Sequence, residues 1–135
     1  MKFTNTLVAL LFIALITSLS CKKNTQPPVQ DTTPRKVRFV LYTSKDFSSD
    51  DKTITFSLRI GSNPHLIWDS VLAPMKIKDI PTPGNKLTIE KTFTGGNNAD
   101  LSVAFLYAIE NVGNSWHLDT IKAGNNLKTV EYDFQ

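Results

Sequence analysis

Alternating apolar and polar positions dominate the chain after Pro34 and predict β-strands. The clearest run spans Thr53 to Ile60, in which every second residue is large and apolar. Val37, Phe39 and Leu41 alternate with more exposed positions in the same way. A period of two is typical of a strand with one buried face. Further runs of this kind occupy residues 87–93, 116–121 and 130–134.

The segment Leu101 to Ile109 is apolar on both phases of the alternation. This pattern is typical of a strand that is covered on both faces or lies centrally in its sheet. The glycine-rich and asparagine-rich stretches around it, 95–98 and 111–115, are expected turns. We therefore expect this strand near the middle of the domain.

The segment Asn63 to Met75 permits two interpretations. Asn63 and Pro64 could begin a helix. As a strand, the segment would place Leu66, Trp68, Ser70 and Leu72 on one face. The content of Ile67, Trp68 and Val71 favours the strand.

These runs together predict an all-β protein, an antiparallel two-layer β-sandwich of about seven strands. The pattern resembles immunoglobulin-like and fibronectin type III domains over residues 35–135. The paired core cysteines of antibody domains are absent, because the chain has a single cysteine. A transthyretin-like sandwich or a small β-barrel remains an alternative, and no function follows from the fold alone.

The first twenty residues, 1–20, have the anatomy of a signal peptide. Lys2 supplies a positive start, and Leu7 to Ile16 is uninterrupted and apolar. A run of this length is too short to cross a bilayer as a helix, which needs about 20 residues. We expect the segment to be removed during export.

The residues that end this segment, Ser18, Leu19, Ser20 and Cys21, resemble the lipobox of bacterial lipoproteins. Ser18 stands where that family usually has leucine. The resemblance implies cleavage before Cys21 and a thioether-linked diacylglycerol on its sulfur, so the membrane is an expected partner. It also implies a cell-envelope protein anchored in the outer membrane and facing the periplasm. An ordinary secretory signal is the alternative.

Residues 21–34 carry the cysteine and then a polar, proline-rich stretch that predicts a flexible tether. Residues 35–135 are long enough for one β-sandwich domain. The net charge of +3 is small and spread along the chain. Nucleic acid is therefore not an expected partner, because its binding needs a concentrated basic surface.

Large aromatic residues are the best candidates for a binding surface. Trp116 follows a turn, and we expect it to be the most exposed of them. Trp68 and Tyr42 are weaker candidates. An aromatic face could stack on a glycan or cover an apolar patch of an envelope protein. The alternative is that Trp68 and Tyr107 simply fill the core.

Three carboxylates, Asp46, Asp50 and Asp51, lie in one short turn. They could contribute ligands to calcium, but their spacing does not match an EF-hand loop. Aspartate is also common in turns, where it bonds nearby backbone groups. We expect a simple turn, with no metal and no cofactor.

The chain has two histidines, His65 and His117, and no catalytic motif joins them to a nucleophile. We therefore expect a non-enzymatic binding or structural module whose partner is an envelope protein or a glycan. The alternative is a small envelope hydrolase with an acid/base site assembled by the fold.

Overall fold

The computed structural model describes residues 32–62 and 64–135. The strands are β1 (Pro34–Tyr42), β2 (Thr53–Ser62), β3 (His65–Val71), β4 (Met75–Lys76), β5 (Leu87–Thr94), β6 (Leu101–Ile109), β7 (Gly113–Ile121) and β8 (Leu127–Asp133), and one 3₁₀ helix, η1, spans Ile77–Asp79. The predicted signal peptide and Cys21 lie outside the described residues. Within the described part, no helix is long and apolar enough to cross a membrane.

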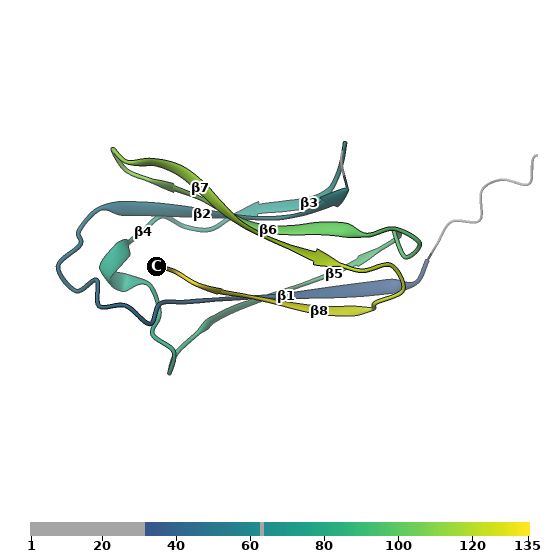
Figure 1. The fold of residues 1–135 in the computed structure, drawn as a ribbon, viewed down its shortest axis with the longest axis horizontal. Helices are drawn as coiled ribbons and strands as arrows, with labels where there is room; N and C mark the ends of the chain where they lie inside the picture. Colours follow the sequence, from purple (N-terminus) through teal and green to yellow (C-terminus); the bar gives the residue numbers. More distant parts are fainter. Residues whose placement is uncertain (1–31, 63) are drawn as a thin grey trace, which may run out of the picture.

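The strands form two sheets packed face to face, with β2, β3, β6 and β7 above β1, β5 and β8 in Figure 1. One sheet has the order β5-β1-β8. The other has the order β3-β2-β6-β7, and the two-residue strand β4 also pairs with β2. This arrangement confirms the predicted all-β sandwich. The short β4 is the strand that the alternation did not reveal.

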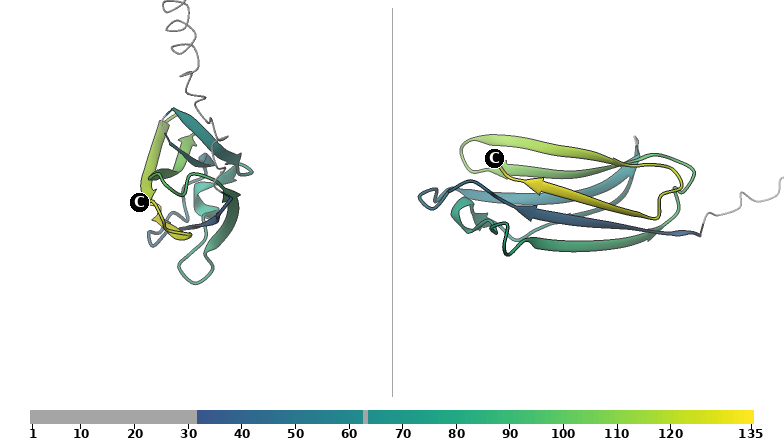
Figure 2. Two further views of the ribbon diagram at one scale, coloured as in Figure 1. Left: turned by 90° about the vertical axis from the view of Figure 1, so that its right-hand side faces the viewer. Right: turned by 60° about the horizontal axis from the view of Figure 1, so that its bottom comes forward.

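The pair β1 and β8 is parallel, with Lys36 opposite Leu127 and Tyr42 opposite Asp133. The prediction of a wholly antiparallel sandwich is wrong for this pair. After β7 the chain crosses to the other sheet, where β8 forms the edge strand beside β1 (Figure 2). Hydrophobic alternation shows which face a residue takes and carries no information on strand direction.

The core lies between the sheets and is built from the inward positions of β1, β2 and β6. Its most buried members include Phe39, Phe56 and Phe105. Phe39 and Phe105 meet edge to face across the two sheets, with ring centroids 5.5 Å apart. β6 is a central strand, as its two-sided apolar pattern predicts.

The segment after position 63 is a strand, which confirms the preferred interpretation. The register of β2 and β3 shifts between Ile60 and Gly61, so that Gly61 lies opposite Leu66 and Ile60 opposite Trp68. Ile67 is the extra residue of this bulge. The bulge turns Leu66 to the outer face, and the prediction that it shares a face with Trp68 is wrong.

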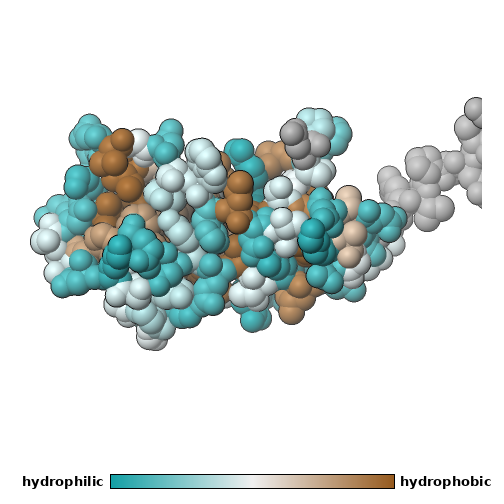
Figure 3. Space-filling model, viewed as in Figure 1, coloured by the Kyte–Doolittle hydropathy of each residue, from teal (hydrophilic) through white to brown (hydrophobic). Residues whose placement is uncertain are grey.

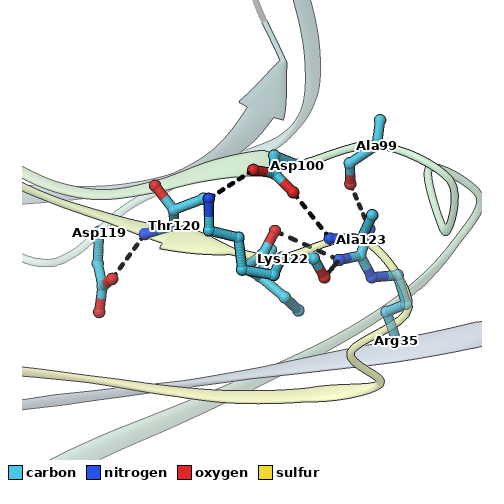
Figure 4. A network of polar contacts seen from close by, with 8 residues as sticks. Arg35, Ala99, Asp100, Asp119, Thr120, Lys122 and Ala123 are labelled. Carbon is cyan, nitrogen blue, oxygen red and sulfur yellow. Dashed lines mark hydrogen bonds and ion pairs between the residues drawn. The ribbon is translucent and has the colours of Figure 1, made fainter.

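The side chain of Arg35, near the start of β1, is fully buried and holds this strand in place. Its guanidinium donates to five backbone carbonyl oxygens, those of Gly96, Ala99, Ile121, Lys122 and Asn125. Figure 4 shows this side chain between the loop before β6 and the turn after β7. The charge is thus solvated by protein carbonyls instead of water, at the end of the sandwich where the described chain begins.

The two long sides of the sandwich are closed by side chains. On one side, Asp119 of β7 pairs with Lys128 of β8 at 2.7 Å, and the rings of His117 and Tyr132 stack with centroids 4.8 Å apart. On the other side, Trp68 of β3 packs on Phe39. Lys91 of β5 lies 5.4 Å from the Trp68 ring centroid, which explains a lysine in the inward phase of β5.

Candidate binding face

The outer face of the β5-β1-β8 sheet is covered by paired charges. Glu90 accepts from Lys36 at 2.8 Å and from Arg38 at 2.8 Å. Lys86 pairs with Glu131. Such exposed pairs contribute little to stability, but they leave the surface hydrophilic. Leu127, opposite Lys36 at the start of β8, is the exposed large apolar residue that the described strands place on this face.

The outer face of the β3-β2-β6-β7 sheet is different, and we call it the open face. Its members follow from the strand register. They are Leu66, Asp69 and Val71 of β3; Thr55, Ser57, Arg59 and Gly61 of β2; Ser102, Ala104, Leu106 and Ala108 of β6; and Asn114, Trp116, Leu118 and Thr120 of β7.

Large apolar side chains border the open face on both edge strands. Leu66 and Val71 of β3 are 53% and 65% exposed, and Trp116 and Leu118 of β7 are 64% and 60% exposed. Figure 3 shows apolar residues at the end of the molecule where β7 lies, and further ones in the middle and along the lower side of this view. Apolar residues gathered on one face mark a site of interaction more often than scattered ones do.

The two central strands carry mostly small residues between these borders, and a shallow groove results. The groove has a volume of about 390 Å³. Its apolar lining comes from Pro64, Leu66, Ala104, Leu106 and Leu118, and its polar lining from Arg59, Ser62, His65 and Ser102. Among the described residues, no carboxylate lines the groove. The volume lies in the range of small-ligand sites, about 300–1,000 Å³.

Gly61 shapes the end of this groove. A Cβ at this position would lie 2.7 Å from the carbonyl oxygen of His65 and 3.3 Å from the Cα of Leu66. The bulge brings the β3 backbone so close that only glycine fits. Gly61 therefore fixes the position of Leu66 on the open face.

Two charges on the open face have no partner within the described residues. Arg59 and Asp69 lie directly opposite each other on β2 and β3. Neither forms a hydrogen bond or an ion pair with residues 32–62 or 64–135. Both side chains are exposed and remain available to a ligand.

The sheet edges are poorly suited to pairing with another strand. β3 is bulged, and β5 carries the inward-pointing Lys91. The edges of β7 and β8 are held together by the pair of Asp119 and Lys128. Bulges and inward charges are features that block strand addition. A partner would therefore contact the face of the sheet.

The three aromatic candidates lie in three different environments. Trp116 is on the open face. Trp68 points into the core against Phe39, as does Tyr107 against Phe56, so the core alternative holds for both. Tyr42 is half-buried, and Lys86 covers its ring at 4.1 Å. Of these candidates, Trp116 alone is placed to meet a partner on the open face.

The carboxylates of the acidic turn, Asp46, Asp50 and Asp51, form hydrogen bonds and ion pairs with nearby groups. Asp46 accepts from the backbone N–H of Ser48, which lowers the Asp46 pKa. Asp50 accepts from the N–H of Lys52. Asp51 pairs with Lys78 at 2.6 Å, and this hydrogen bond lowers its pKa. Among the described residues, no three histidine, cysteine or acidic side chains are grouped as a metal site.

The two histidines lie on the opposite edge strands of the β3-β2-β6-β7 sheet, so the fold does not bring them together. His65 lines the groove on the outer side. His117 faces inward onto Tyr132. Partial burial raises the pKa of nearby Asp119, but bonds from Lys128 and the Thr120 N–H outweigh it and leave the pKa lowered.

Sequence reasoning missed Arg59, Leu118 and Ala104 as site residues. A signal existed, because the outward phase of 101–109 is apolar and the adjacent 116–121 segment has Trp116 and Leu118 on one phase. Pairing of these strands gathers both apolar rows on one surface. The alternation carries no information on whether another element covers that surface. In the structure, no described element covers it.

Comparison with known proteins gives no further guide to the site, since no family model, no curated protein and no solved structure matches the chain.

Proposed function

We propose that this protein is a lipid-anchored module of the bacterial cell envelope that binds a partner protein through the open face. The observation that carries the proposal is the row of four exposed apolar side chains, Leu66, Val71, Trp116 and Leu118, along both borders of one sheet face. The opposite sheet face carries paired charges and one large exposed apolar residue, Leu127. This contrast supports one specialised contact surface.

The anchor belongs to the same proposal. Cys21 would carry the lipid, residues 22–33 would act as the tether up to the start of β1 at Pro34, and the domain would face the periplasm from the outer membrane. The motivation is the lipobox-like sequence and the proline-rich stretch after it. Two or more acyl chains hold a protein firmly on a membrane.

We also propose an immunoglobulin-like arrangement for the sandwich. The neighbours β3, β2, β6 and β7 follow the order of strands C′, C, F and G in such domains. The antiparallel hairpin of β6 and β7 beside β2 fits this comparison. The parallel pair of β1 and β8 departs from the simplest version of the fold.

A protein fits the open face better than a glycan does. Leucine and valine supply three of its four exposed apolar side chains, and aliphatic groups bury well against another protein surface. A glycan would use flat aromatic rings, and Trp116 is the one ring on this face. Trp116 is also of a residue type enriched at the centres of protein interfaces.

The test is recovery of a partner with the intact lipoprotein from solubilised envelopes. Trp116→Asp changes the open face, and Thr88→Asp places the same charge on the outer face of β5 as a control. We expect a partner that co-purifies with the wild type and with Thr88→Asp but not with Trp116→Asp. Recovery that is equal in all three samples would contradict the proposal.

A further inference from the structure

We propose that the groove around Arg59 binds an anionic amphiphile, a molecule with an acyl chain and one acidic group. This inference concerns the groove of about 390 Å³ and goes beyond the proposed protein partner. The groove shares Leu66 and Leu118 with the open face but does not require Trp116, which is absent from its lining.

The sign of the charge in the groove favours an anion. Arg59 and His65 are the ionisable residues of the lining, and both belong to basic types. Arg59 has no protein acceptor in the described residues, so its donors are open to an acidic oxygen. A guanidinium matches a carboxylate or phosphate with two parallel hydrogen bonds.

One carboxylate, Asp69, stands beside the groove on the strand next to Arg59. It does not line the groove, and no ion pair joins it to Arg59. A ligand with a single acidic group can therefore meet Arg59 without displacing an internal partner. A ligand with several negative charges would meet repulsion from Asp69.

The apolar part of the groove favours a chain. Leu66 lies on one side and Leu118 on the other, with the buried methyl of Ala104 between them. From β3 to β7 the groove crosses three strand spacings, about 14 Å. Slender acyl groups fit a groove that is floored by small residues, and their burial there removes apolar surface from water.

Position in the fold places such ligands within reach. The groove includes Ser62 and His65, at the end of the sandwich where β1 begins. If the chain is anchored through Cys21, this end is the one joined to the tether. Free fatty acids and the anionic phospholipids of the same membrane share the required chemistry.

Photoaffinity labelling of the full lipidated chain in zwitterionic nanodiscs tests the inference. One arm adds a fatty acid with a photoreactive group in its chain, and a second arm uses a phosphatidylglycerol with the same group. A neutral monoacylglycerol probe is the ligand control. We expect one or both anionic probes to label residues 59–66 and 102–118, and the neutral probe to label them at least fivefold less.

Two variants make the result specific. Arg59→Gln should lower labelling by an anionic probe at least fivefold. Leu118→Ser should lower this labelling as well. Both variants should keep the wild-type melting temperature. Lys45→Gln removes a cation from a distant loop and should change nothing. Absence of groove labelling with both anionic probes, or equal labelling of wild type and Arg59→Gln, overturns the inference. Neither outcome bears on partner recovery by Trp116.

Discussion

The guanidinium Nη2 of Arg35 donates to the carbonyl oxygen of Lys122 at 2.9 Å, across a separation of 87 residues. This bond joins the first strand to the turn before the last strand. The same side chain also holds the loop around Gly96 and Ala99. One buried cation thus fixes both loops at the end of the sandwich where β1 begins.

Arg35→Met should therefore destabilise the domain strongly. Replacing the guanidinium leaves five carbonyl acceptors without their donor. We expect a loss of about 3 kcal/mol or more in the free energy of unfolding, measured with urea. Arg38→Met removes an exposed arginine paired with Glu90 and should cost about 1 kcal/mol or less. Equal losses of unfolding free energy in the two variants would show that Arg35 does not hold this end of the sandwich together.

Stability should fall in acid, partly through Asp100. Its pKa lies below the ordinary value of 3.8 because Lys122 and the Ala123 N–H bond to the carboxylate. A lowered native pKa means that its stabilisation is present above the unfolded pKa and is lost as pH falls through the native pKa. We expect stability to decline from about pH 5 to about pH 2.

The contribution of Asp100 can be isolated with Asp100→Asn. This variant should be less stable than the wild type at pH 7 and should lose less stability on acidification. Urea unfolding at several pH values measures both. A variant with the same pH dependence as the wild type would remove Asp100 from the explanation.

Gly61→Ala should destabilise the bulge between β2 and β3. The new Cβ would lie 2.7 Å from the His65 carbonyl oxygen, so the β3 backbone must shift. We expect a loss of about 1–3 kcal/mol. Gly84→Ala is the matched control, because a Cβ there meets nothing within 4 Å. Its unfolding free energy should stay within about 1 kcal/mol of the wild type, and a similar result for Gly61→Ala would contradict the bulge geometry.

The two tryptophans should separate stability from binding. Trp68→Ala removes a ring that packs on Phe39 and under Lys91, and we expect a loss of about 3 kcal/mol. Trp116→Ala removes an exposed ring and should change stability by about 1 kcal/mol or less. Partner recovery should fall with Trp116→Ala at intact melting temperature. A large stability loss in Trp116→Ala would mean that the ring belongs to the fold.

The anchor has a chemical test of its own. Mass spectrometry of the mature protein should find Cys21 at the N-terminus with diacylglycerol on its sulfur. An unmodified Cys21, or cleavage at another residue, would refute the lipoprotein assignment.

Local alternation was sufficient to predict most of the fold. The inward rows of β2 and β6 follow directly from period two. In β7 the phase is the reverse of what hydrophobicity predicts, because Trp116 and Leu118 point outward while His117 and Asp119 point inward. The bulge at Gly61 was not predictable, because it depends on where β3 lies against β2. The parallel pairing of β1 and β8 depends on the return of the chain from β7, which no local pattern encodes.

The candidate site was harder to predict for a related reason. Trp116 could be selected from a single turn, but the open face needs four strands in register. In the sequence, Arg59 is simply one polar position in an alternating strand. Its place in a groove becomes visible only when the fold puts Ala104 and Leu118 beside it. Arg35 shares the phase of Val37 and Phe39, and this was a readable sign of its burial.

The central claim is that the open face is the binding surface. Its most direct test is a photoreactive phenylalanine analogue at position 116 of the intact lipoprotein in cells, compared with the same analogue at position 88 on the other sheet. The account predicts one discrete crosslinked protein from position 116 and none from position 88. Crosslinks of equal yield from both positions, or none from position 116, would contradict it.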